Sequence, residues 1–416
     1  MRHSIMTAVA LFALGIDCAC ATPRARDLGV PFEGQPGPLN AITDVGGVEV
    51  GHVTLISGDG PLRVGEGPIR TGVTVVLPRG RAHAGNRDTV YGGFFNMNGN
   101  GELTGQAYLQ DFGVIYGPIG LSNTNALGQV YAGIQLWTQR QFGEAADPVV
   151  AETWDGRLND IGGFHVEPQH AIAAIEAARA GEVAEGNVGG GTGMVCFGFK
   201  GGIGTASRLV TLGSDRYTVG VLVQCNTGDR QTLRIAGAPV GRELTDKWLP
   251  CYVEAVPLNA TESRCSARAS VSAATRDQGS IIIVVATNAP LIPLQLQRLA
   301  RRAALGLGRM GSYAGSSSGD LVASFTTAGT ANYPDAQQVT PIQQIPSLEI
   351  DPLFKGTVEA TEEAITNALV AAETMTGAGG LRVYGIPHEA LRRILKRYGR
   401  LEATKNTRAR DSGKGS

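Results

Sequence analysis

The stretch GSIIIVVATNAPL, residues 279–291, is the strongest fold signal in this 416-residue chain. Residues 281–285 are five consecutive β-branched apolar side chains, a pattern typical of a strand that is buried on both faces. The preceding segment, 262–278, consists of small and polar residues, as in an exposed loop. A polar loop is therefore expected to lead at Ser280 directly into a rigid strand of the core.

Ser280 stands where an amino-terminal nucleophile would be needed, at the start of a strand that fixes its hydroxyl group. The hydroxyl oxygen can attack the Gly279 carbonyl if the backbone is strained, and glycine tolerates the unusual angles of that approach. Hydrolysis of the resulting ester frees a serine α-amine, whose pKa of about 7.7–8.0 suits a base beside its own hydroxyl group. The alternative is an ordinary loop-to-strand junction. Gly-Ser pairs also occur at 213–214, 311–312, 315–316 and 415–416, but none of them opens a strong strand.

Strand and helix patterns occur in both halves of the chain. Apolar or alternating runs predict strands at 74–77, 217–224, 281–286 and 321–327. Apolar residues at helical spacing predict helices at 168–181, around 294–303, at 358–375 and at 387–398. Because both kinds of element come from both halves, we predict an α+β fold in which sheet layers are covered by helices.

The composition fits an exported globular protein. Apolar residues make up 43% of the chain and the net charge is −1, which gives no reason to expect nucleic acid or an anionic membrane as a partner. Residues 1–21 have a short basic start, an apolar run too short to span a bilayer and an Ala-Cys-Ala cleavage site. This pattern predicts a signal peptide and a periplasmic or secreted protein. The mature chain, 22–416, is expected to be one domain with a disordered tail at 403–416.

Neither the cysteines nor the histidines form a metal-binding motif. The chain has no CxxC or HExxH sequence, and its six histidines are scattered, so no metal site is expected. Cys251 and Cys265 flank a polar segment and could pair in an oxidising compartment. Cys196 and Cys225 lie in apolar runs and are predicted to be buried core thiols.

The glycine-rich run GNVGGGTG, 186–193, is the remaining conspicuous motif. It lacks the lysine and hydroxyl residue of a phosphate-binding P-loop. The run GGIG at 201–204 has no clear strand–glycine–helix unit, so it is also a weak dinucleotide fingerprint. Backbone packed close to an active site explains these glycines better.

Several of these motifs, in this order, resemble the bacterial L-aminopeptidase/D-esterase and β-peptidyl aminopeptidase family. The resemblance covers nearly the whole mature chain. It rests on GNVGGGTGM at 186–194, FKGGIGTASR at 199–208, GSIIIVVATNAPL at 279–291, ITDV at 42–45 with VGH at 50–52, NGNGELTG at 98–105, and ETWDG at 152–156 with LNDI at 158–161.

The resemblance implies a four-layer αββα sandwich, shared with ornithine acetyltransferase and similar to the amino-terminal nucleophile hydrolases apart from strand connectivity. It also implies autocatalytic cleavage between Gly279 and Ser280 into chains 22–279 and 280–416, and a tetramer of such pairs. No metal or organic cofactor is needed. Asn226 would line the oxyanion hole, while Ser318 and Asp320 would orient protons around the nucleophile.

Two further residues match the substrate-binding positions of the family. Glu152 would hold the free amino group of a short peptide or small amide, because an exopeptidase needs a negative group set back from its nucleophile. Trp154 stands where relatives carry an aromatic residue, often tyrosine, and tryptophan has no phenolic hydroxyl group. The segment between Asn226 and Ser280 is longer than expected for the family, so the resemblance does not define the shape of the pocket rim.

The favoured hypothesis is an exported aminopeptidase that releases small or β-amino residues through an acyl-enzyme on Ser280. Three alternatives are an amidase or esterase of the same family, an acetyltransferase of the same fold, and a non-catalytic periplasmic binding protein. Export argues against a biosynthetic acetyltransferase. Pocket shape separates amidase from peptidase, and an intact chain would favour the binding protein.

Overall fold

The computed structural model describes residues 22–85, 87–244, 246–253, 264–265, 278–329 and 341–402. The predicted signal peptide, 1–21, and the predicted disordered tail, 403–416, lie outside these described residues.

The predicted central strand is β12 (Gln278–Thr287), an inner strand of a six-stranded sheet with the order β4-β3-β13-β12-β10-β9. It pairs antiparallel with β10 (Asp215–Asn226) and parallel with β13 (Ser317–Thr326). Alternate side chains of β12 enter two different buried clusters, which explains its unbroken apolar run. The other strands of this sheet are β3 (Val90–Gly99), β4 (Val114–Ile115) and β9 (Gly202–Leu212).

A second, four-stranded sheet packs against the first. Its order is β1 (Glu49–Ser57), β2 (Ile69–Leu77), β5 (Ile119–Asn123) and β6 (Val149–Thr153). A buried apolar cluster between the sheets joins Ile282 and Val284 of β12 to Leu121 of β5 and Ala151 of β6. Two sheets packed face to face through such a core form the centre of the molecule.

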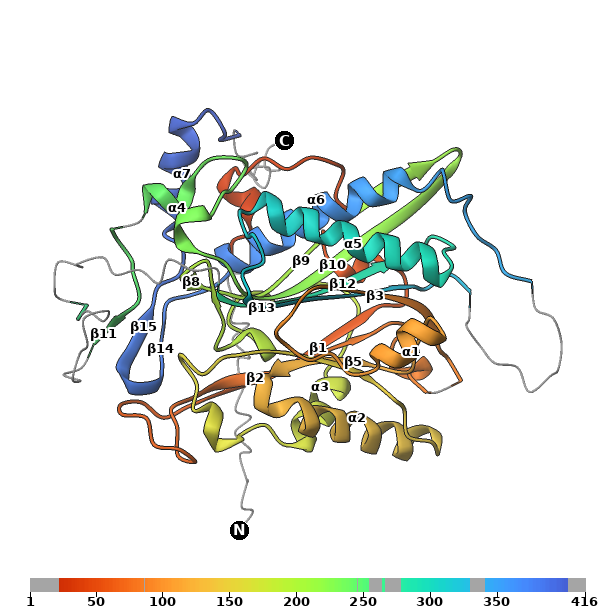
Figure 1. Ribbon diagram of the computed structural model, residues 1–416, viewed down its shortest axis with the longest axis horizontal. Coiled ribbons are helices and arrows are strands. Elements are labelled where there is room, and N and C mark those ends of the chain that lie inside the picture. Colours follow the sequence, from red (N-terminus) through yellow and green to blue (C-terminus); the bar gives the residue numbers. More distant parts are fainter. Residues whose placement is uncertain are drawn as a thin grey trace, which may run out of the picture.

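Helices cover the outer face of each sheet. Helices α5 (Pro293–Arg309) and α6 (Asp351–Val370) lie on the six-stranded sheet, and α2 (Leu127–Phe142) and α3 (Pro168–Glu176) lie on the four-stranded sheet. Figure 1 shows the four layers from top to bottom as helix, sheet, sheet and helix. The predicted αββα sandwich is therefore confirmed, and the solved relatives described below share it.

Short elements complete the fold. They are the helices α1 (Gln106–Asp111), α4 (Val240–Glu243) and α7 (His388–Arg397), the hairpin of β7 (Val195–Cys196) and β8 (Phe199–Lys200), and a small sheet of β11 (Cys251–Tyr252), β15 (Leu381–Val383) and β14 (Met375–Thr376). Among the described residues, no helix is both long enough and apolar enough to span a bilayer.

The predicted bounds of two helices were wrong. Helix α3 stops at Glu176 rather than at 181, because Arg179 and Val50 exchange backbone hydrogen bonds of 3.1 Å and this bridge draws the chain out of the helix. Helix α6 begins at Asp351 rather than at 358 and continues through Gly356, where a side chain would press on Val210. It ends at Val370, before the residues that form β14.

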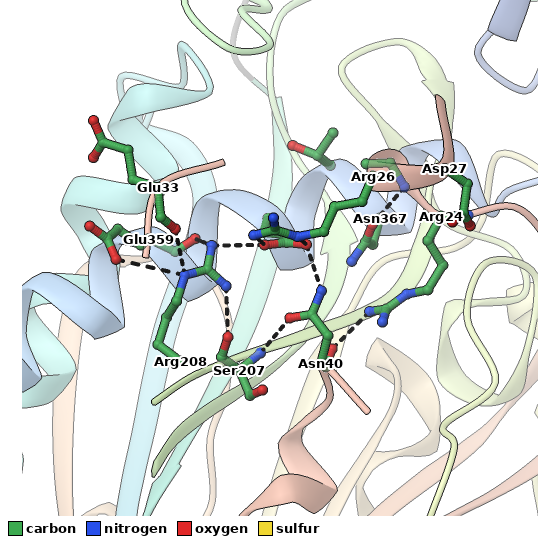
Figure 2. Close-up of polar contacts among 12 residues, drawn as sticks. Arg24, Arg26, Asp27, Glu33, Asn40, Ser207, Arg208, Glu359 and Asn367 are labelled. Carbon is green, nitrogen blue, oxygen red and sulfur yellow. Dashed lines mark hydrogen bonds and ion pairs between the residues drawn. The ribbon is translucent and has the colours of Figure 1, made fainter. Parts of the chain in front are cut away.

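A cluster of buried and partly buried charges joins the first residues of the described chain to α6. Glu363 of α6 lies 2.7 Å from Arg26 in the amino-terminal segment and 2.7 Å from Arg208 of β9. Figure 2 shows Arg26 and Arg208 together with Asn40, which donates a further hydrogen bond to Glu363. Burial alone would raise the pKa of Glu363, but the two arginines hold that pKa below its usual value. The cluster joins parts of the chain on both sides of the proposed cleavage point.

Candidate active site

Ser280 lies at the start of β12, next to a glycine that no other residue could replace without strain. Gly279 has a φ of +116°, and a Cβ atom built on it would lie 1.8 Å from the backbone oxygen of Asn226. The Ser280 side chain is only 6% exposed. Its Oγ accepts a hydrogen bond of 3.2 Å from the backbone N–H of Gly319 on β13. The fold therefore fixes both the hydroxyl group and the peptide bond before it.

Asn226, the last residue of β10, lies directly opposite Ser280 in the sheet register. Its Oδ1 accepts a 2.8 Å hydrogen bond from the backbone N–H of Val195, and its Nδ2 donates a 2.9 Å bond to the backbone oxygen of Trp154. A backbone N–H can only donate and a carbonyl can only accept, so these partners settle which way the amide points. The nitrogen carries two N–H groups, which leaves one for an oxyanion.

Glu152 lies on β6 of the other sheet and is 5% exposed. Its Oε1 accepts a 3.0 Å bond from the backbone N–H of Glu102, and its Oε2 accepts one from the Thr124 hydroxyl group. A Cβ atom built on Gly101 would lie 3.2 Å from Oε1 and 3.5 Å from the Cα atom of Gly319. Gly101 thus lies next to both the Glu152 carboxylate and Gly319, whose N–H donates to Ser280 Oγ.

The electrostatics of Glu152 follow from this setting. Burial raises the pKa of its carboxyl group, and the hydrogen bonds from Thr124 and from the Glu102 backbone oppose that rise. A carboxylate that is poorly solvated gains more from a cationic partner than an exposed one does. This setting suits a cationic partner for Glu152, and binding of a substrate ammonium group there stays a prediction.

Trp154 links the two sides of the site through its backbone rather than through its ring. Its carbonyl oxygen accepts the hydrogen bond from Asn226. Trp154 is 48% exposed, and its indole ring lies over Gly156, where an added Cβ atom would come within 2.5 Å of it. The ring offers an exposed apolar surface, and its contact with substrate stays a prediction.

Ser318 and Asp320 form the predicted pair, but on the opposite face of the sheet from the Ser280 hydroxyl group. Ser318 is in register with Gly279, and Gly319 with Ser280, so side-chain alternation points Ser318 and Ser280 to opposite faces. The Ser318 hydroxyl donates a 2.7 Å bond to Asp320, and Thr227 lies 3.3 Å from the same hydroxyl. The pair is thus placed beside the 279–280 peptide bond.

The glycine-rich run packs against the core, as expected for backbone close to an active site. A Cβ atom on Gly190 would lie 2.1 Å from the Gln224 side chain of β10. The buried Lys200 donates hydrogen bonds to the carbonyl oxygens of Gly191 and Gly201, and burial lowers its pKa to about 7. These contacts hold the run against the strand that ends in Asn226.

The prediction for two of the cysteines was wrong. Cys196 and Cys225 are buried, as predicted, but they form a disulfide instead of remaining free thiols. They are 29 positions apart, and only the folding of β7 against the end of β10 brings their Cα atoms to 5.6 Å. The pairing expected for Cys251 and Cys265 is confirmed. Among the residues that the structure describes, no group of three potential ligands could hold a metal ion.

Sequence reasoning missed the groups that orient the site residues. Thr124 and the N–H groups of Val195 and Gly319 each contact a predicted site residue. The two backbone donors carry no side-chain signal, and Thr124 lies in a different part of the chain from Glu152. No pattern in the sequence could have identified them.

Comparison with known proteins decides the family. Residues 40–383 match Peptidase family S58. The chain belongs to this family. It is 51% identical over 385 residues to beta-peptidyl aminopeptidase BapA of Sphingosinicella microcystinivorans, an alignment that covers 92% of this chain and 94% of that protein. A second protein of that name, from Sphingosinicella xenopeptidilytica, is 48% identical over 94% of this chain and 95% of its own length.

A solved structure supports the same assignment for this S58 peptidase. The L-aminopeptidase D-Ala-esterase/amidase of Ochrobactrum anthropi superposes with a TM-score of 0.80 at 40% identity, over 91% of this chain and 99% of that one. That protein is described as a prototype for the serine aminopeptidases and as a new variant of the Ntn hydrolase fold. The resemblance inferred from the motifs is confirmed, and the chain is a serine aminopeptidase.

Proposed function

We propose that this S58 peptidase is exported, cleaves its own chain between Gly279 and Ser280, and then uses Ser280 as an amino-terminal nucleophile. The observation that carries the proposal is the arrangement of groups around Ser280. The glycine before it has a positive φ, the Gly319 N–H donates to its hydroxyl group, and Asn226 lies opposite it in the sheet. These are the parts needed for attack by a hydroxyl group on a carbonyl and for stabilisation of the resulting oxyanion.

Cleavage would proceed by attack of Ser280 Oγ on the Gly279 carbonyl carbon, which moves the acyl group from nitrogen to oxygen. Water then hydrolyses the ester, leaving a carboxylate on Gly279 and a free α-amine on Ser280. The Ser318–Asp320 pair, beside this bond, is suited to stabilise the new ammonium group. In later turnovers the neutral amine would take the Oγ proton as Oγ attacks the substrate, and return it to the leaving amine.

The direct test is the amino-terminal sequence of the mature protein. A denaturing gel should show two chains, and Edman sequencing of the smaller one should begin Ser-Ile-Ile-Ile, the sequence at 280–283. Sequencing of the larger chain should begin near Thr22 if the first 21 residues are removed on export. A fully active protein that runs as one intact chain would refute the proposal.

Export is supported by the leader-like sequence and by the two disulfides, since such bonds persist in oxidising compartments. The substrate is proposed from the relatives. Two of them are named beta-peptidyl aminopeptidases, so we propose short peptides and amides with small or β-amino residues at their amino terminus. The Ochrobactrum protein is described as an esterase and amidase, and matched β-alanyl, α-alanyl and D-alanyl ester substrates would rank these activities by kcat/KM.

Glu152 is proposed to bind the substrate ammonium group, and a Glu152→Gln variant should show this as a change in KM. The lost charge-assisted hydrogen bond, about 1.5–3 kcal/mol, corresponds to a rise in KM of roughly 10- to 150-fold for a free-amine amide. Because burial raises the pKa of Glu152, its carboxylate should become protonated at a higher pH than that of an ordinary glutamate. On acidification, the wild-type KM should therefore begin to rise at that higher pH. The variant should lack this dependence.

The control for Glu152 is the same amide with its amino group acetylated. This neutral substrate cannot pair with the carboxylate, so the wild-type enzyme should hydrolyse it poorly. Equal rates on the free and the acetylated amide would remove the exopeptidase assignment, while leaving self-cleavage untouched.

A further inference from the structure

The Cys196–Cys225 disulfide includes the residue that immediately precedes Asn226. Cys225 precedes Asn226 at the end of β10, and Cys196 follows Val195 in β7. The bond therefore connects the residue next to Asn226 with the residue next to the donor that orients its side chain. Both cysteines are fully buried in the core cluster.

Few hydrogen bonds join β7 directly to β10, although the β7–β8 hairpin packs in the same buried cluster and β8 leads into β9, which pairs with β10. In the described part of the chain, β7 pairs only with β8, in a separate two-stranded sheet, so no ladder of the six-stranded sheet includes it. The polar links are the bond from Val195 to Asn226 and a 2.6 Å bond from the Phe197 N–H to the Thr227 oxygen. Arg230 also donates to the Phe197 oxygen. Each such hydrogen bond contributes only about 0.5–1.5 kcal/mol net to stability. The disulfide, in contrast, is a covalent link that does not open without a reductant.

We propose that the Cys196–Cys225 disulfide is a positioning element of the oxyanion hole, which acts on the reaction only through Asn226. This inference rests on the proposed function, in which Asn226 stabilises the tetrahedral intermediate. With the bond open, the Val195 N–H is free to move away from Oδ1, and the amide can rotate about its broad terminal torsion. The donor then no longer points at the oxyanion. Because the oxyanion exists only in the transition state and the intermediate, the loss falls on kcat and not on KM.

A double-mutant cycle tests this coupling. Asn226→Ala alone should lower kcat by about 10²–10³-fold, as for other oxyanion donors. The disulfide-free variant Cys196→Ala/Cys225→Ala should lower kcat by at least about tenfold at unchanged KM, because a misdirected donor loses part of the same stabilisation. In the Asn226→Ala background the same cysteine changes should lower kcat no further. All values are taken per mole of cleaved enzyme.

The second disulfide of the chain is the matched control. Cys251→Ala/Cys265→Ala also removes one covalent link, and any effect it has should multiply with that of Asn226→Ala. Thermal unfolding should show that each cysteine pair lowers stability equally with and without the Asn226→Ala substitution. A disulfide-free enzyme with full kcat, or one whose loss multiplies in full with Asn226→Ala, would overturn the inference.

If the Cys196→Ala/Cys225→Ala protein does not fold or cleave, the mature wild-type enzyme serves instead. Dithiothreitol gives two electrons and two protons to the bond and closes to its own cyclic disulfide. The enzyme is reduced in the lowest urea concentration that allows the bond to open, as detected by alkylation and mass spectrometry. Oxidised enzyme in the same urea concentration is the reference. Loss of kcat should follow opening of Cys196–Cys225, and full kcat with that bond open contradicts the proposal. A wild-type protein without two chains or activity would refute the proposed function instead.

Discussion

A Ser280→Ala variant is expected to remain a single uncut chain and to lose aminopeptidase activity. The substitution removes Oγ, which in the proposed mechanism both attacks the Gly279 carbonyl and carries the acyl group. Loss of the nucleophile from a serine hydrolase lowers kcat on the order of 10⁶-fold. The fold should survive, because the side chain is small and its described bond is a single one from the Gly319 N–H. Mass spectrometry of the purified protein and the hydrolysis rate of a β-alanyl amide measure the two effects.

Two variants make this result specific. Ser214→Ala changes the serine of another Gly-Ser pair, in the exposed turn between β9 and β10, and should leave cleavage and activity as in the wild type. Ser280→Cys retains a nucleophile and should still be cut, at an altered rate. If Ser280→Ala protein matures at the same bond, another group performs the cleavage and Ser280 is not the nucleophile.

The Gly279→Ala variant should also have a large effect, because its methyl group has no room. The new Cβ atom would lie 1.8 Å from the Asn226 oxygen, so β12 and β10 must separate locally. That movement displaces the scissile carbonyl from Oγ, and a misplacement of about 1 Å can cost on the order of 10²-fold in rate. We expect self-cleavage to slow by at least this factor, with a lower melting temperature. A time course of the precursor band on a denaturing gel measures the rate.

The Gly213→Ala variant is the control that separates the cost of a positive φ from the cost of a steric clash. Gly213 also has a positive φ, +61°, but no atom lies within 4 Å of the position that an added methyl group would take. This variant should lose only the backbone cost of about 1–2 kcal/mol and should cleave normally. Cleavage of Gly279→Ala at the wild-type rate would show that the close approach to Asn226 does not control the reaction.

The sequence predicted the layers better than the contacts between them. The apolar run at 281–285 requires burial on both faces, and this places β12 inside the sheet whatever its neighbours are. The ends of α3 and α6 depend on partners far along the chain, such as the bridge between Val50 and Arg179, and no local pattern carries that information. The Cys196–Cys225 pairing was missed for the same reason.

The candidate site divides in the same way. Gly279 and Ser280 could be singled out as candidates from local order, because a loop that enters a buried strand at a serine is a sequence pattern, but the choice of a nucleophile over an ordinary loop-to-strand junction rested on the resemblance. Glu152 and Asn226 were named only through resemblance to a family, since their side chains read alone as a surface carboxylate and a turn residue. The structure adds what holds them: Thr124 for the carboxylate and the Val195 N–H for the amide. Contacts made by backbone groups of segments far apart in the sequence cannot be predicted from local residue patterns.

The strand order of the central sheet has a consequence for the enzyme if the proposed cleavage takes place. All of β13 and nearly all of β12 follow the proposed cleavage point, yet these strands lie between β3 and β10, which precede it. The two product chains would thus be interleaved, and neither could complete the sheet alone. The precursor assembles this sheet within one molecule, whereas separated products would need to find each other, so that recovery from denaturant would slow on dilution. The durability of the mature enzyme would then rest on a barrier to opening rather than on repeated reassembly.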